Sequence, residues 1–250
     1  MKWYPERHAR VSYKQETDMI KIRRSDDRGH TKLSWLDSRH TFSFGDYHDP
    51  EQMGFSALRV INEDRVIPGA GFPTHSHRDM EIITYVLEGA LAHKDSTGTS
   101  SVIRVGELQR MSAGMGISHS EYNASQTEPV HFLQIWIIPD QAGMKPGYEQ
   151  QLVPFDKNRG RWTLIASQSG RDHSVTVHQD VDLWVGRFLQ EAQTTFRLKP
   201  GRHGFIQAAR GAVTVNGITL NAGDGAAVTQ EEILDFKTIA GAEMLLFDLA

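Results

Sequence analysis

Two short segments place metal-ligating residue types at alternate positions. The first contains His75 and His77, and the second contains His119 and Glu121. Side chains at i and i+2 of a β-strand point to the same face, about 6.6 Å apart along the backbone, so two such strands side by side could hold one ion between them. Three imidazoles and a carboxylate suit iron, nickel, copper, zinc or manganese better than calcium or magnesium. A coordination position left open would make such a site catalytic rather than structural.

The composition limits which other chemistries are available. The chain has no cysteine, which excludes disulfides, thiolate ligands and cysteine nucleophiles. A net charge of -4 gives no reason to expect direct nucleic-acid binding. No segment approaches the ~20 apolar residues of a membrane span, and the N-terminus lacks the apolar centre of a secretion signal. We therefore expect a cytoplasmic protein with no membrane partner.

The elements that would position these residues are short strands. With 22 glycines in 250 residues, the chain alternates β-type runs with turn residues, a pattern typical of a sandwich or barrel. Residues 132–138 are apolar on both faces, which predicts a central strand. Residues 139–147 are the expected connection between two domains. The predicted strands are 55–62, 81–87, 101–105, 131–138, 162–167, 181–189, 211–215 and 243–249.

A short internal repeat favours two domains. Residues 88–93, EGALAH, resemble residues 210–215, RGAVTV, at an offset of 122 positions (210 minus 88). At that offset the first two histidines correspond to Arg197 and Lys199, whose positive charges would oppose a divalent cation. We expect an arm of unknown role at 1–19, a metal-binding barrel at 20–145 and a metal-free barrel at 146–250.

Two longer stretches carry a family resemblance. The segments GAGFPTHSHRDMEIITYVLEG from Gly69 and GELQRMSAGMGISHSEYN from Gly106 look like the two motifs of the cupin superfamily, with Gly114 where proline is usual. Together with WLDSRHTFSFGDYHDPEQMGFSALRVINED from Trp35, they resemble the pirin family of bicupins, quercetinase-like bacterial pirins in particular. The resemblance covers the chain from about residue 19 onward. It implies an all-β fold of two tandem cupin (jelly-roll) β-barrels.

The resemblance also implies a ligand set. In pirins the ion is held by the histidines of the first motif and by the His and Glu of the second, which here are His75, His77, His119 and Glu121. Many other cupins use the first-motif glutamate, so Glu81 is the alternative carboxylate; otherwise it would orient a ligand imidazole. We expect one divalent transition metal per chain, Fe(II) first, with Ni, Cu, Mn, Co or Zn as alternatives.

The implied function is that of a metal-dependent dioxygenase. Pirin-family members that resemble this chain include quercetinases, which cleave the central ring of flavonols; flavonol and dioxygen would then be the substrates, and Glu121 would take the flavonol hydroxyl proton. One alternative is a metal-binding regulatory protein that acts through a protein partner, as animal pirins do. A cupin isomerase or hydrolase acting on sugars is another. Flavonol turnover with oxygen uptake separates the first reading from both.

Further residues could surround the metal. An apolar pocket over the ion, or ordinary barrel core, would use Phe42, Phe44, Met53, Phe55 and Met111. Among the histidines outside the ligand set, His40 is of interest because it lies in the family-like HTFSF stretch. The others, including His93, are expected to be solvated or structurally hydrogen-bonded.

Overall fold

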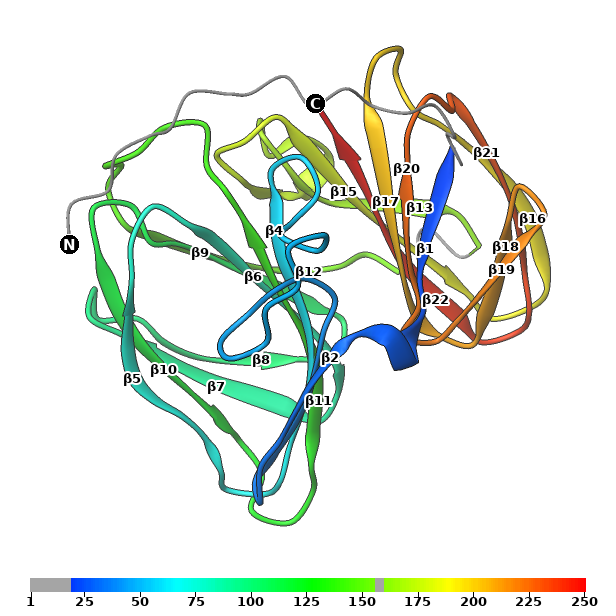
Figure 1. Ribbon diagram of the computed structural model, residues 1–250. Coiled ribbons are helices and arrows are strands. Elements are labelled where there is room, and N and C mark those ends of the chain that lie inside the picture. Colours follow the sequence, from blue (N-terminus) through cyan, green and yellow to red (C-terminus); the bar gives the residue numbers. More distant parts are fainter. Residues whose placement is uncertain (1–18, 156–159) are drawn as a thin grey trace.

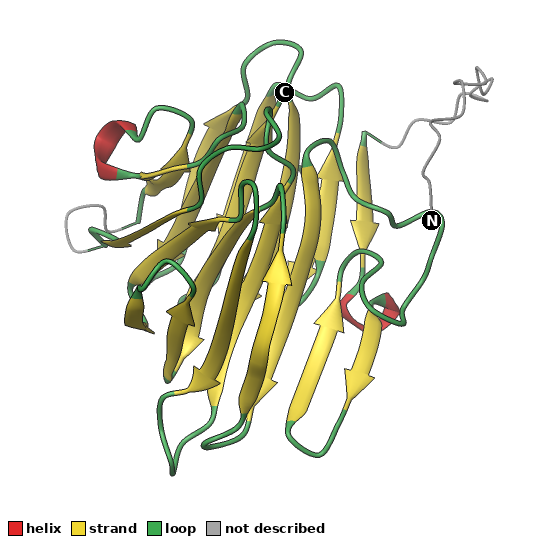
Figure 2. Ribbon diagram, turned by 90° about the vertical axis from the view of Figure 1, so that its left-hand side faces the viewer, coloured by secondary structure: helices red, strands yellow, loops and turns green. Residues whose placement is uncertain are grey.

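The computed structural model describes residues 19–155 and 160–250, so the expected N-terminal arm lies almost wholly outside the described residues. The described part forms 22 strands and two three-residue 3-10 helices (Figures 1 and 2). No helix in it is long and apolar enough to cross a membrane. The first half contains β1 (Ile20–Arg23), β2 (Gly29–Lys32), β3 (Leu36–His40), β4 (Leu58–Val66), β5 (Gly71–His77), β6 (Glu81–Glu88), β7 (Ala90–Asp95), β8 (Ser100–Arg104), β9 (Glu107–Ser112), β10 (Ile117–Asn123), β11 (Val130–Ile137) and β12 (Gly147–Leu152). The second half contains β13 (Trp162–Ser167), β14 (Val175–Thr176), β15 (Val181–Phe188), β16 (Ala192–Arg197), β17 (His203–Arg210), β18 (Ala212–Val215), β19 (Ile218–Asn221), β20 (Gly225–Val228), β21 (Ile233–Thr238) and β22 (Ala242–Leu249).

Two seven-stranded and two four-stranded sheets form a pair of barrels with the same strand order. The N-terminal barrel joins β12-β9-β6-β11-β4-β3-β2 to β5-β10-β7-β8, and the C-terminal barrel joins β1-β20-β17-β22-β15-β13-β14 to β16-β21-β18-β19. Strands β6 and β17 begin at Glu81 and His203, which preserves the offset of 122 (203 minus 81). The expected all-β double barrel is confirmed, and so is the repeat. The run at 132–138 falls on β11, which lies inside its sheet between β6 and β4.

The two barrels exchange one edge strand each. Strand β1 pairs with β20 of the C-terminal barrel, from Ile20 opposite Val228 to Arg23 opposite Gly225 (Figure 1). Strand β12 occupies the matching edge of the N-terminal barrel, on β9. These two strands do not follow the expected division of the chain at 145/146. Strand β1 was expected in the first barrel and lies in the second, and β12 was expected in the second and lies in the first. The chain crosses to the second barrel after Leu152, later than the expected connection at 139–147.

The largest apolar core lies between the two seven-stranded sheets. Their central strands are therefore buried on both faces, which explains why they are apolar on both faces. Leu133 and Ile135 of β11 belong to one cluster with Leu183 of β15 and Phe247 of β22. Residues at equivalent places also meet across this junction: Arg210 Nη1 lies 3.2 Å from Glu88 Oε1. Such contacts arise when two copies of one unit face each other. The barrels are consequently packed as one body around a shared core.

Candidate metal centre

Three neighbouring strands each present two polar side chains to the interior of the N-terminal barrel. Strand β10 lies between β5 and β7, and His119 pairs in register with His75 on one side and with Asp95 on the other. Glu121 in turn pairs with His93. Strand alternation sends all of these side chains to one face, as the i, i+2 spacing requires. The predicted pairs on β5 and β10 thus meet. A third pair from β7 joins them: His93, which was expected to be solvated or structurally hydrogen-bonded, and Asp95, which the sequence analysis did not consider.

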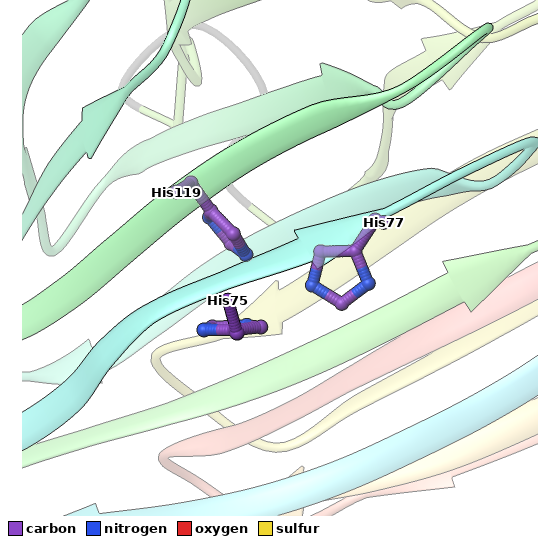
Figure 3. Close-up of side chains that lie close together, drawn as sticks. All are labelled: His75, His77 and His119. Atoms are coloured by element: carbon purple, nitrogen blue, oxygen red, sulfur yellow. The ribbon is translucent and has the colours of Figure 1, made fainter.

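The three predicted imidazoles converge (Figure 3). Ring centroids are 4.8 Å apart for His75 and His77, 4.5 Å for His75 and His119, and 4.9 Å for His77 and His119. One ring nitrogen from each lies within 4.8 Å of the others. An ion placed among them needs nitrogens about 2.0–2.1 Å away, so only small side-chain rotations would close the site around it.

Close contact between β5 and β10 keeps these residues together. Gly71 lies so near β10 that a Cβ added there would stand 2.2 Å from the carbonyl oxygen of Glu121. Only glycine permits that approach. On the outer face, the hydroxyls of Ser76 and Ser118 are hydrogen-bonded at 2.7 Å. Ser76, between His75 and His77, and Ser118, next to His119, therefore help to hold β5 and β10 in register.

The surroundings of the histidines favour neutral imidazole. Burial, reinforced by the nearby His75, lowers the pKa of His77 to about 4. Burial, together with the neighbouring histidines, lowers the pKa of His119 to about 3. His75 Nδ1 is 2.8 Å from the carbonyl oxygen of Pro73, an acceptor only, so Nδ1 carries a proton and Nε2 is the nitrogen available for a metal. Neutral rings with free lone pairs are the form that coordinates a metal.

Unpaired buried nitrogens support the same assignment. His119 is 1% exposed, and both of its ring nitrogens are buried without a hydrogen-bond partner among the described residues. Leaving buried polar atoms unpaired is costly, so each such group needs an explanation. A transition metal would satisfy one nitrogen of His119 directly. The three-histidine cluster can therefore hold a metal ion.

Glu121 is buried beside the histidine triad. Its two carboxylate oxygens accept hydrogen bonds from Gln134 Nε2 at 3.2 and 3.1 Å. Burial, aided by the nearby Asp64, raises the pKa of Glu121 to about 7 despite that hydrogen bond. Its carboxylate groups most closely with His93 and His119, and it also lines the cavity that His75 and His77 line.

That cavity, of about 200 Å³, has an aromatic side and a polar side. Aromatic walls come from Phe44, Phe72 and Trp136; the Trp136 ring packs edge-on to both Phe44 and His77. Polar groups come from His40, whose Nδ1 lies 2.8 Å from Asn62 Oδ1. His40 thus lines the cavity, as its place in the HTFSF stretch suggested.

Four of the five candidate pocket residues lie elsewhere. Phe44 lines the cavity, whereas Phe42 and Phe55 line a different cavity, between the barrels. Met111 is fully buried in the core, and Met53 is 43% exposed. The sequence analysis missed Phe72, Gln134 and Trp136, although the alternation of β11 places Gln134 and Trp136 on one face.

Glu81, the alternative carboxylate, faces the junction of the barrels. Its Oε2 accepts hydrogen bonds from the backbone N–H of His178 at 3.2 Å and from His178 Nδ1 at 3.1 Å, and Arg110 Nε is 4.0 Å away. Neither group of potential ligands in the described residues includes it. Among the described residues, it makes no hydrogen bond to any of the three clustered histidines. Its hydrogen bonds to His178 instead connect the two halves of the chain.

The second barrel differs from expectation in which residues face inward. Arg197 and Lys199 are exposed, whereas Phe196 and Leu198 are buried. The connection after His77 has three residues before β6, but four separate Leu198 from β17, so the true equivalence on this strand is offset by 121 rather than 122. A one-residue shift reverses the facing of a strand. The cations therefore lie outside the barrel, and apolar side chains take the positions of the ligands.

A double barrel of this topology, with a histidine cluster inside one barrel, defines a metal-binding bicupin. Comparisons with known proteins agree with that class. Residues 21–137 match the family model "Pirin", and residues 164–249 match "Quercetinase C-terminal cupin domain". The chain belongs to the pirin family.

One relative and two solved structures of YhhW define the relationship further. The chain is 48% identical to "Quercetin 2,3-dioxygenase" of Escherichia coli strain K12 over 92% of its own length and 99% of that protein. The crystal structure of YhhW from Escherichia coli matches with a TM-score of 0.89 and 46% identity, covering 93% of this chain and 98% of that one. The structure of that bacterial pirin in complex with nickel(II) matches with a TM-score of 0.88 and 46% identity, over 92% and 99% of the two chains.

Proposed function

We propose that this chain is a metal-dependent dioxygenase that cleaves flavonols such as quercetin. The observation that carries the proposal is the group of three histidines that opens into an aromatic-walled cavity with a buried carboxylate. The relative named as a quercetin 2,3-dioxygenase, whose sequence aligns over nearly the whole chain, supports the same reaction.

His75, His77 and His119 would hold the ion, with Glu121 as a fourth ligand. A divalent transition metal there, for which we propose Fe(II), supplies Lewis-acid stabilisation of an oxyanion and an oxidisable centre. The nickel complex of a relative supports a divalent ion without identifying the physiological one. The neutral state of His77 and His119 prepares the site for binding, because no proton must first be removed from these rings.

Glu121 would accept the hydroxyl proton of the flavonol. Burial, which raises the pKa of Glu121 to about 7 in the metal-free protein, favours proton uptake by this carboxylate. The amide of Gln134 holds both oxygens, so the carboxylate is fixed in direction while it changes protonation state. Deprotonation makes the flavonol ring electron-rich, which is what attack by dioxygen requires.

The cavity walls suit a flat aromatic substrate. Phe44, Phe72 and Trp136 provide faces and edges for ring packing, which contributes beyond simple area burial. His40 and Asn62, hydrogen-bonded to each other, offer polar contacts at the same cavity. A flavonol, apolar across its rings and polar at its hydroxyls, has the matching chemistry.

The proposal is tested by following quercetin absorbance and oxygen consumption together, using protein reconstituted with Fe(II) and, separately, with Ni(II). We expect one oxygen consumed per flavonol lost. The matched control substrate is a flavone that lacks the hydroxyl beside the carbonyl, which should not turn over because it offers no proton to Glu121. Absence of flavonol turnover with every divalent metal tested, in protein that binds metal, would refute the proposed reaction.

A further inference from the structure

The pair His93 and Asp95 lies on β7, directly beside the ligand strand β10. Both side chains are fully buried, and His93 Nε2 lies 3.0 Å from Asp95 Oδ2. The other carboxylate oxygen of Asp95 accepts from the backbone N–H and hydroxyl of Thr97 at 2.9 and 2.6 Å and from the backbone N–H of Thr99 at 3.2 Å. A carboxylate so fixed accepts the Nε2–H of His93. The remaining nitrogen, Nδ1, therefore carries a lone pair.

The lone pair on His93 Nδ1 lies close to His119, whose ring nitrogens also lack hydrogen-bond partners among the described residues. His93 Nδ1 is buried without a partner, and so are both nitrogens of His119. An imidazole that ligates a metal through one nitrogen normally donates its other N–H to an acceptor. When one nitrogen of His119 holds the ion, its second nitrogen becomes such a donor. One hydrogen bond between the two rings would then give a partner both to the second nitrogen of His119 and to His93 Nδ1.

The geometry permits that bond. The ring centroids of His93 and His119 are 5.3 Å apart, with an interplanar angle of 49°. Two imidazoles joined by an N–H···N bond have centroids roughly 5 to 5.5 Å apart, because each nitrogen lies about 1.2 Å from its ring centre. The two rings therefore already lie at the separation that such a bond requires.

Other acceptors near His119 are already engaged. Asp95 lies opposite His119 in register, but its oxygens serve His93, Thr97 and Thr99. Glu121 accepts from Gln134 with both oxygens and is the proposed fourth ligand. Of the side chains of His93, Asp95 and Glu121, His93 thus offers the acceptor atom that makes no hydrogen bond at all within the described residues, Nδ1.

We propose that His93 is a positioning residue for the metal centre: its Nδ1 accepts a hydrogen bond from the non-coordinating N–H of His119. Asp95, His93 and His119 then form a chain from β7 to the ion that fixes the tautomer and direction of the His119 ring. This inference rests on the metal site of the proposed function, but it concerns residues to which that function assigns no role.

Two conservative variants separate the acceptor from the pair with Asp95. In His93→Asn the amide occupies the place of Nδ1, so an acceptor for His119 is retained. In His93→Gln the amide reaches the place of Nε2, so the contact with Asp95 is retained and the acceptor is lost. The matched control is His131, another buried histidine of the same barrel, whose Nε2 lies 2.9 Å from Glu63 Oε1, away from the metal site.

The experiment measures the Ni(II) dissociation constant and stoichiometry of the metal-free full chain by calorimetry, together with the absorption spectrum of the Co(II)-loaded protein. We expect His93→Gln to weaken Ni(II) binding roughly 10- to 100-fold and to shift the Co(II) bands, as loss of a hydrogen bond to a ligand does. His93→Asn should recover most of the affinity. His131→Gln should bind Ni(II) as the unmodified chain does and give the same Co(II) spectrum.

Several results would overturn the inference. Unchanged affinity and spectrum in His93→Gln would show that His119 has no partner in His93. Two Ni(II) ions in the unmodified chain, with one lost in His93→Gln, would make His93 a ligand instead. Failure of the unmodified chain to bind Ni(II) or Co(II) would refute the metal site itself, whereas intact metal binding without flavonol turnover would refute only the proposed reaction.

Discussion

The two barrels have the same strand order, but the interior of the first is polar and that of the second is apolar. In the N-terminal barrel, the four-stranded sheet turns histidines and carboxylates inward from β5, β10 and β7. In the C-terminal barrel, the equivalent strands β16, β21 and β18 turn in Phe196, Phe236 and Val213, which belong to one continuous apolar cluster. The N-terminal barrel instead has two small clusters on either side of its polar centre. The same architecture therefore holds a candidate metal site in one copy and a packed apolar core in the other.

The comparison indicates that the first barrel provides the candidate site and the second barrel provides more of the stability. A polar interior contributes little to stability, because buried polar groups are costly unless they are paired. The apolar C-terminal barrel and the shared core between the sheets can supply what the first barrel lacks. The exchanged strands β1 and β12 connect both barrels, so we expect them to unfold together rather than one by one.

The largest effect is expected for His119→Ala in the polar barrel. Removing a ligand should weaken metal binding by more than the roughly 10- to 100-fold that loss of a supporting hydrogen bond causes. The protein should remain folded, because the apolar clusters are untouched. Elemental analysis together with thermal unfolding of the metal-free forms measures both. Normal metal content in both His119→Ala and His75→Ala would contradict the assigned site.

Phe236→Ala in the apolar barrel should produce the reverse result. Phe236 is 1% exposed within the C-terminal core, so its truncation should lower the free energy of unfolding by about 3–5 kcal/mol. Metal content per folded chain should not change. Urea unfolding and metal analysis of the same preparation provide the check, and a selective loss of metal would show that the barrels are not specialised in this way.

Glu121→Gln tests the role of the buried carboxylate. Three imidazoles should retain some metal, while flavonol turnover falls by roughly 100- to 10,000-fold, the usual contribution of a general base. Glu81→Gln is the matched control, since Glu81 is equally buried but faces His178 and Arg110. Its metal content and turnover should stay close to those of the unmodified chain. If metal binding is lost in Glu81→Gln and kept in Glu121→Gln, the two carboxylates have been assigned the wrong way round.

The pH dependence of metal affinity should reflect Glu121 first. Its carboxyl has a pKa of about 7 in the metal-free protein and must lose its proton to coordinate, so affinity should fall as the pH drops below about 7, by up to tenfold per unit. His77 and His119 should compete with protons only below about pH 4 and about pH 3. If the histidines had the ordinary pKa of imidazole, metal affinity would instead weaken only below about pH 6. Calorimetric titrations from pH 8 to 5 distinguish the two, and Glu121→Gln should flatten the upper part of the profile.

The smallest effect is expected where the cations of the second barrel are removed. Arg197 and Lys199 are exposed, so the double change to alanine should alter the free energy of unfolding by no more than about 0.5 kcal/mol per site. No ion should be gained, because the inward positions hold Phe196 and Leu198. A second bound ion in this variant would revive the idea that surface charge alone keeps metal out.

Local chemistry in the sequence determined most of the N-terminal site. Strand alternation is a property of the backbone, so the spacing of His75 and His77, and of His119 and Glu121, fixed which side chains share a face. The motifs around them indicated the family and the double barrel. The same spacing was present in His93 and Asp95, but only the pairing of β7 with β10 shows that this pair belongs with the others.

Tertiary structure decided what depends on contacts between distant segments. The direction of Glu81 follows from its partner His178, 97 positions away, and the exchange of β1 and β12 follows from edge pairing across the two halves. Which side chains of β16 face inward depended on one extra residue between β16 and β17, because a shift of one residue reverses the facing of every side chain on β16. Alternation is local and can be read along the chain. Register and neighbours are set by the burial of a shared core, which no single segment encodes.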